Sequence, residues 1–266
     1  MWKLGFIGEN SLEAVEQDCL LAKRLGYTGL EYNYWGDFRD LTADTVKRMH
    51  DIHQKHGVGV SMLAIWGWNH LSLDPAERAE AHQMLDRAID FAHTLQADVI
   101  GTGGGEIPGE PLGRKVEEFR QVFPPFLARM KDAGLQPVFY AVHGNSFFDG
   151  LPAYEAVWAH LPDVKIKYDP ANWRHHGDDY LEVAMKYGHK VGHVHIKEHV
   201  YKNGDLVSQP AAGMGDIEFP KVFAFLYEHG YEGWLSVEPH GGIWARGEGR
   251  VKMLTITKRY LEQFLV

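Results

Sequence analysis

Eight repeats of an apolar, strand-like segment followed by a segment of helical periodicity run through the 266 residues. Repeated βα units require parallel strands and right-handed crossovers, and eight of them close into a (β/α)₈ barrel of about 250 residues. The alternative, a doubly wound open sheet, usually has a glycine-rich first turn, and Gly8-Glu9-Asn10 is not one. The sequence therefore predicts an α/β fold, a TIM barrel, with one domain over residues 1–266. The expected strands are Lys3–Gly8, Gly29–Tyr34, Val58–Ile65, Val99–Thr102, Gln136–His143, Val164–Asp169, Val191–Lys197 and Gly233–Glu238.

Capping residues indicate where the helices between these strands begin and end. Asp74-Pro75-x-Glu77 is a strong helix start, because Asp caps the helix and Pro fits its first position. Gly26 and Gly57 are typical helix stops. Periodic apolar residues predict one continuous helix over Val116–Ala133, and a long loop over His199–Glu218.

Charge and cysteine content exclude several classes of protein. The net charge of −9 argues against nucleic acid as a partner, since such binding needs a basic surface. The single cysteine, Cys19, excludes an intrachain disulfide and a cysteine-based zinc site. No stretch resembles a signal peptide or a membrane span. We therefore expect a cytoplasmic protein without a membrane partner.

Polar residues stand at the carboxyl ends of three successive core strands: Asp169, His195 and Glu238. Side chains alternate along a strand, so His193, His195 and Lys197 share one face. Buried carboxylates and imidazoles are costly unless paired, and a cation satisfies all three strand-end residues at once. Each residue taken alone has a structural explanation, such as a helix cap or an ion pair for Asp169. Together they predict a metal site with Asp169, His195 and Glu238 as ligands, and His193 as a deeper, structural residue.

Carboxylate and imidazole ligands suit Mn, Co, Zn or Fe better than Ca. The expected cofactor is a divalent metal, with Mn, Co, Zn and Mg as the candidates. His143 is a further candidate, as a catalytic base or as another ligand, or else as a capping residue. Expected substrate contacts are Trp66, His70, Glu106, Asn172 and Lys197. Trp66, Trp68 and His70 would form an apolar wall, although simple packing at the barrel mouth explains Trp68 slightly better.

The chain resembles the xylose isomerase-like TIM-barrel superfamily, in its sugar phosphate isomerase/epimerase branch. The resemblance covers essentially the whole chain, and the order and spacing of its motifs are fairly specific. They are G-L-E-Y at 29–32, N-H-L-S-L-D-P-A-E-R at 69–78, Y-D-P-A-N at 168–172, H-V-H-I-K-E at 193–198, G-M-G-D-I-E-F at 213–219 and S-V-E-P at 236–239.

This resemblance implies a divalent metal held by four side chains, three of which fall on Asp169, His195 and Glu238. The fourth, a Glu on strand five, is Ala141 here, where the family's E-N-H-G reads A-V-H-G. In the epimerases of this family that Glu and the strand-eight Glu often form the acid/base pair. His143 could replace the missing ligand, the protein could have lost its metal, or Ala141 could have been introduced deliberately to stop turnover.

The resemblance implies a metal-dependent isomerase or epimerase that acts on a sugar or keto-sugar through an enediolate, with Glu238 and His143 moving the proton. A lyase of the inosose dehydratase or keto-glycoside C-deglycosidase type would use the same site. A catalytically silent sugar-binding or partner subunit is a different class, and a homo- or hetero-oligomer stays open. A DNA repair endonuclease is disfavoured by the acidic charge and by Glu31 and Trp66, which stand where extra metal-binding histidines are expected.

Overall fold

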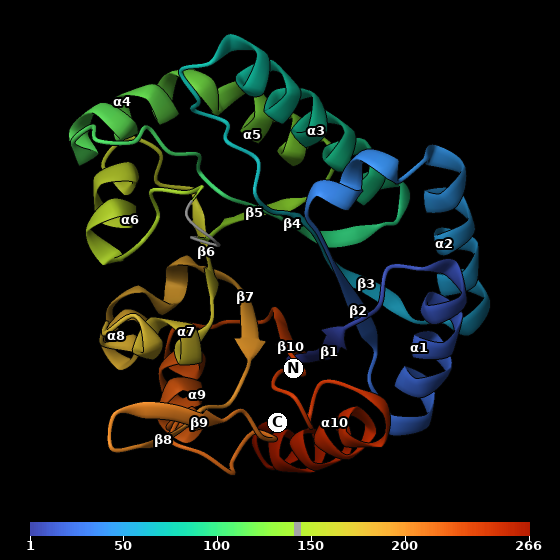
Figure 1. The fold of residues 1–266 in the computed structure, drawn as a ribbon. Helices are drawn as coiled ribbons and strands as arrows, with labels where there is room; N and C mark the ends of the chain where they lie inside the picture. Colours follow the sequence, from blue (N-terminus) through green and yellow to red (C-terminus); the bar gives the residue numbers. More distant parts are fainter. Residues whose placement is uncertain (141–144) are drawn as a thin grey trace.

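A computed structural model describes residues 1–140 and 145–266, and it has the predicted barrel architecture. Eight parallel strands close on one another in the order β1-β10-β7-β6-β5-β4-β3-β2, and helices form a ring around them (Figure 1). The strands are β1 (Lys3–Ile7), β2 (Gly29–Tyr34), β3 (Gly59–Ile65), β4 (Ala97–Thr102), β5 (Gln136–Phe139), β6 (Lys165–Tyr168), β7 (Val191–Ile196) and β10 (Trp234–Val237).

Helices follow the strands as predicted, but one predicted helix differs and the short helix α7 (Pro170–His175) was not predicted. The predicted helix over Val116–Ala133 is wrong, because it is two helices, α4 and α5, that meet at Phe123. Pro124 and Pro125 follow Phe123 and cannot donate backbone hydrogen bonds within a continuing helix. The helices are α1 (Leu12–Leu25), α2 (Ala43–His56), α3 (Pro75–Thr94), α4 (Leu112–Val122), α5 (Pro124–Asp132), α6 (Leu151–Trp158), α7 (Pro170–His175), α8 (Tyr180–Tyr187), α9 (Phe219–Glu228) and α10 (Gly247–Leu261), with short 3₁₀ turns η1 (Gly36–Asp40), η2 (Gly188–Lys190) and η3 (Glu262–Phe264).

Local sequence signals set the ends of these elements. Asp74 caps α3 through Oδ1, which accepts hydrogen bonds from the backbone amides of Ala76 and Glu77. Gly26 and Gly57 end α1 and α2 in the left-handed conformation that glycine tolerates. The predicted loop over His199–Glu218 holds a small antiparallel hairpin, β8 (Val200–Lys202) and β9 (Asp205–Ser208), which the sequence pattern did not indicate.

The interior of the barrel is divided into an apolar half and a polar half. The inward residues of β3, β4 and β5 form a separate apolar cluster of Met62, Ala64, Trp66, Val99, Val138 and Tyr140. On the other side, β2, β6, β7 and β10 bury the polar residues Glu31, Lys167, His193, His195 and Ser236. A buried polar row on adjacent strands needs internal partners, so this half is where the barrel can do chemistry.

Trp234 closes the amino-terminal end of the barrel. A Cβ built on Gly29 would lie 2.4 Å from its indole, so only glycine fits there. Its Nε1–H donates to Asp98, 2.7 Å away, and Asp98 also pairs with Lys3. Trp234 therefore fills the barrel axis at this end. Within the part of the chain that the structure describes, no helix combines the length and apolar character needed to cross a membrane.

Candidate active site and metal centre

A cavity of about 620 Å³ opens at the carboxyl ends of the barrel strands. Its polar lining includes Asn33, Asn172, His195, Lys197 and Glu238. Active sites of TIM-barrel enzymes lie at this end, and ligand cavities typically measure about 300–1,000 Å³. The cavity therefore lies where the sequence placed the functional residues.

His195, buried on β7, lies between three carboxylates. Its Nε2 is 2.8 Å from Glu31 Oε1, and its Nδ1 is 2.9 Å from Glu238 Oε2 and 3.9 Å from Asp169 Oδ2. Burial alone would lower the pKa of His195, but the charge of Glu31 and hydrogen bonds to Glu238 and Glu31 raise it above its usual value. Each ring nitrogen of His195 therefore faces a carboxylate, Nε2 that of Glu31 and Nδ1 that of Glu238.

Glu31, on β2, joins the two histidines of β7. Its Oε2 accepts a hydrogen bond from His193 Nε2 at 2.8 Å, in addition to the bond that Oε1 accepts from His195. Burial would raise the pKa of Glu31, but the nearby imidazoles hold that pKa well below its usual value. Burial lowers the pKa of His193, which supports its interpretation as a structural, neutral residue.

Asp169 has one oxygen engaged and one without a hydrogen bond. Oδ1 caps α7 by accepting from the backbone amide of Asn172 at 3.0 Å. Oδ2 is buried and accepts no hydrogen bond from any residue that the structure describes. A buried carboxylate oxygen of this kind is costly without a partner, and a cation in front of it would supply one.

Glu238 completes the carboxylate side of the site. Its Oε1 lies 3.1 Å from Lys197 Nζ and 3.2 Å from His240 Nδ1. Burial would raise the pKa of Glu238, but Lys197, His195 and His240 hold it well below its usual value. Glu238 is therefore ionised and directed toward both the cavity and His195.

These residues fit a divalent metal. One ligand atom from each of Asp169, His195 and Glu238 lies within 4.8 Å of the others, and Asp169 brings an oxygen that lacks a partner. A second group, Glu31 with His193 and His195, is equally close. In that group hydrogen bonds from His193, His195 and Asn33 already satisfy both oxygens of the Glu31 carboxylate. The residues around Nδ1 of His195 therefore suit a metal better than those around its Nε2.

Two hydrogen bonds through Asn33 link the indole of Trp66 to the carboxylate of Glu31. Trp66 Nε1–H donates to Asn33 Oδ1 at 2.6 Å, and Asn33 Nδ2 donates to Glu31 Oε1 at 2.8 Å. Trp66 lines the cavity as predicted, whereas Trp68 lies in a smaller neighbouring pocket beneath Arg39, 4.4 Å from its guanidinium. Asn33 thus fixes both the indole and the carboxylate.

Two predicted substrate contacts lie elsewhere. His70 is fully buried, with Nε2 2.9 Å from Thr102 Oγ1 and its ring edge-on to Phe123, and burial lowers its pKa to about 3. Glu106 pairs with Lys115 at 2.5 Å. Neither is among the residues that line the cavity, so their positions do not support a substrate contact. Asn172 and Lys197 do line it.

The predicted residue His143 and the position Ala141 lie outside the described residues. Sequence reasoning did not single out Glu31 as the partner of His193 and His195, or Lys167 as a residue that lines the cavity. Both stand at inward register positions of predicted strands, Glu31 two residues before Asn33 and Lys167 two residues before Asp169. That alternation was the available signal, but the pairing of Glu31 with β7 depends on barrel closure, which brings together residues 162 or more positions apart.

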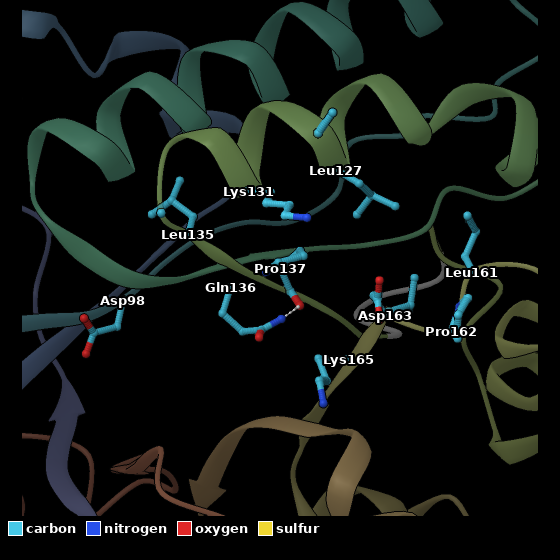
Figure 2. Close-up of a pocket in the computed structure, with 13 residues that line it drawn as sticks. Asp98, Leu127, Lys131, Leu135, Gln136, Pro137, Leu161, Pro162, Asp163 and Lys165 are labelled. Carbon is cyan, nitrogen blue, oxygen red and sulfur yellow. Dashed lines mark hydrogen bonds between the residues drawn. The ribbon is translucent and has the colours of Figure 1, made fainter.

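A second cavity, of about 580 Å³, lies at the opposite end of the barrel between α5 and the start of β6 (Figure 2). Leucines and prolines form much of its wall, with Lys131, Asp163 and Lys165 among its charged residues. No metal-ligand group of the described residues lies there, and this end of a TIM barrel ordinarily serves stability. It is not the candidate active site.

Comparisons with known proteins find similar chains and similar folds. The chain is 26% identical over 212 residues to an inosose dehydratase of Geobacillus thermodenitrificans, covering 68% of this chain and 69% of that protein. It is 24% identical over 259 residues to an inosose dehydratase of Clostridium beijerinckii, covering 86% and 82%. Other clostridial inosose dehydratases, such as that of Clostridium perfringens, match over 89 residues, about 30% of their length.

A solved structure with the same fold is a D-allulose 3-epimerase from Methylomonas sp. in complex with D-allulose. It has a TM-score of 0.81 and 17% identity, covering 99% of this chain and 97% of that one. A family profile described as xylose isomerase-like TIM barrel matches residues 19–255. The eight-stranded barrel agrees with this match, and the chain belongs to the xylose isomerase-like TIM-barrel family.

Proposed function

We propose that this protein is a divalent-metal-dependent isomerase or epimerase of a sugar or keto-sugar. The observation that carries the proposal is the buried Asp169 Oδ2, which lacks a hydrogen bond and faces His195 Nδ1 beside Glu238. The cavity that His195 and Glu238 line also has the aromatic residues Trp66 and Tyr140 in its wall, a mixture that suits a sugar with a polar edge and an apolar face. The epimerase of the same fold binds D-allulose, and this supports a ketose as the ligand.

Asp169, His195 and Glu238 would hold the metal, with Mn, Co, Zn and Mg as the candidate ions. A metal bound there would act as a Lewis acid on adjacent carbonyl and hydroxyl oxygens and so acidify the neighbouring C–H bond. Glu31 would keep His195 oriented through its bond to Nε2. Lys197 would hold Glu238 in place through Oε1.

Glu238 would accept the carbon-bound proton, because its carboxylate is ionised and lines the cavity, where a bound sugar can reach it. Its lowered pKa makes it a weak base, so the transfer depends on strong acidification of the C–H bond. His143 stays a proposed partner for returning the proton on the other face. Trp66 and Tyr140 would exclude water from the sugar's apolar side.

A lyase is the second candidate, and the inosose dehydratase relatives favour it. The same proton abstraction leads to β-elimination when a leaving group stands next to the carbanion. Substrates would then be inososes or 3-keto-glycosides. Isomerase and lyase share the first step, so one assay can test both.

Proton exchange in D₂O is that assay. The protein with added Mn²⁺ is incubated with ketoses, inososes and 3-keto-glycosides, and deuterium incorporation and products are followed by NMR. Deuterium uptake at the carbon beside the carbonyl, absent in Asp169→Asn, is the expected result. Epimerised product identifies the first candidate, and an unsaturated product identifies the lyase. No exchange with any substrate class would refute both and favour a silent sugar-binding subunit.

A further inference from the structure

Lys167 is a buried cation that the proposed chemistry does not use. It stands on β6 two residues before Asp169 and is only 4% exposed. Lysine is almost never this buried without a paired acid. Yet no carboxylate or other acceptor among the described residues forms an ion pair or a hydrogen bond with its Nζ.

The surroundings of Nζ are aromatic. It lies 4.2 Å from the ring centre of Tyr140 and 5.6 Å from that of Trp66, and all three residues line the cavity. Cation–π contacts of this kind contribute roughly 0.5–2 kcal/mol and satisfy none of the three N–H donors. The ammonium of Lys167 is therefore held against the rings of Tyr140 and Trp66, and its N–H donors are available to a ligand.

Most oxygens of the nearby carboxylates are engaged by other groups, and the exception, Asp169 Oδ2, faces His195. Glu31 accepts from His193 and His195, and Glu238 is paired with Lys197. Asp169 has one oxygen on the α7 amide and the other toward His195. Their charges act on Lys167 through space, but none supplies the missing contact.

We propose that Lys167 binds an anionic group of the substrate, a carboxylate in the first instance, so that the natural substrate is an acidic keto-sugar such as a ketouronate. This inference rests on the proposed function and narrows its substrate class. The carboxylate would lie on the Trp66 and Tyr140 side of the cavity. The oxygens that react would lie on the opposite side, toward His195 and Glu238.

Binding to matched probes tests the inference without turnover. D-fructuronate and D-tagaturonate carry a carboxylate where D-fructose and D-tagatose carry a hydroxymethyl group. Isothermal titration with Mn²⁺ present throughout compares each pair on the wild type, Lys167→Met and Lys167→Arg. Lys190→Met is the matched control, because Lys190 also lies over an indole, that of Trp158 at 5.4 Å, but outside this cavity.

We expect at least one ketouronate to bind the wild type about ten-fold or more tightly than its neutral partner, as a hydrogen bond to a charged group implies. Lys167→Met should remove that preference, because it should weaken the binding of the ketouronate far more than that of the neutral ketose. Lys167→Arg should keep part of the preference for the ketouronate, and Lys190→Met should keep all of it. Circular dichroism and the thermal midpoint confirm that each variant is folded.

Equal affinities within both pairs, or an unchanged preference in Lys167→Met, would overturn the inference. So would failure of both ketouronates to bind. Turnover of neutral ketoses without any preference for anions would overturn it and leave the proposed function standing. A ketouronate preference that depends on Lys167, without proton exchange, would support it and refute the proposed function.

Discussion

Glu31 Oε1 accepts a hydrogen bond from His195 Nε2 at 2.8 Å, and this directs the opposite ring nitrogen of His195 toward Asp169 and Glu238. An imidazole that donates from one nitrogen offers the lone pair of the other to a metal. With a metal bound, the bond between β2 and β7 would keep the proton on Nε2 and leave the lone pair of Nδ1 for the metal.

Replacing Glu31 with Gln should weaken metal binding about 10- to 100-fold, because the amide no longer fixes that tautomer. The dissociation constant for Mn²⁺, measured by titration, checks this. Glu31→Asp, which keeps the charge on a shorter side chain, should recover part of the affinity. Unchanged Mn²⁺ affinity in Glu31→Gln would show that His195 needs no such support.

Asp169→Asn should abolish metal binding without lowering the stability of the metal-free protein. Oδ2 is buried without a hydrogen bond, so removing its charge should leave the metal-free protein as stable or about 1 kcal/mol more stable. The same change should abolish the rise in thermal midpoint on adding Mn²⁺. A metal-free variant several kcal/mol less stable than the wild type would mean that Asp169 is structural instead.

The fold was largely predictable because its signals are local. Alternating strands, the Asp74-Pro75 helix start and the glycine stops need only neighbouring residues. The split between α4 and α5 was also visible at Pro124-Pro125, but the apolar periodicity that runs across it favoured one helix.

The site was less predictable because it depends on barrel closure. Asp169, His195 and Glu238 could be placed because each ends a strand, and strand ends converge. Glu31 could not be joined to His193 and His195, since that contact spans the barrel interior. His70 lies five residues beyond the end of β3, and its ring packs against Thr102 and Phe123 instead of reaching the cavity.

Ala141 gives a prediction that follows from the resemblance. If the fourth ligand of the family is absent here, Ala141→Glu should raise Mn²⁺ affinity at least about ten-fold. Metal analysis and the D₂O exchange assay on both proteins check this. Equal metal content and equal activity would mean that Ala141 has no bearing on the site.

Acid should destabilise the protein through His70. Its pKa is about 3 in the folded protein against 6.5 ordinarily, so only the unfolded chain takes up a proton between these values. The contribution of the neutral His70 to the free energy of unfolding is intact above pH 6.5. It falls by up to about 1.4 kcal/mol per pH unit as the pH drops toward 3. Urea unfolding should show that His70→Gln reduces the loss between pH 6.5 and 4.5 by roughly 2 kcal/mol. The matched change His160→Gln, at an exposed histidine, should not reduce this loss of stability. Parallel plots of stability against pH for the wild type and His70→Gln would contradict this account.

The amino-terminal end of the barrel gives a steric prediction. Gly29→Ala should cost about 1–3 kcal/mol in the free energy of unfolding, because its Cβ would meet the Trp234 indole at 2.4 Å. Gly113→Ala is the control, since nothing lies within 4 Å of a Cβ there and alanine favours helix α4. Equal stabilities of the two variants would show that Trp234 can move aside.

Metal binding by the purified protein tests the central claim most directly. Elemental analysis after dialysis against Mn²⁺, with the thermal midpoint measured alongside, should give about one equivalent of metal. It should also give a stabilisation of about 2.7 kcal/mol at a hundred-fold excess over the dissociation constant. Both effects should vanish in Asp169→Asn. Absence of stoichiometric metal, with a midpoint unchanged by Mn²⁺, Co²⁺, Zn²⁺ or Mg²⁺, would contradict the metal centre and the function built on it.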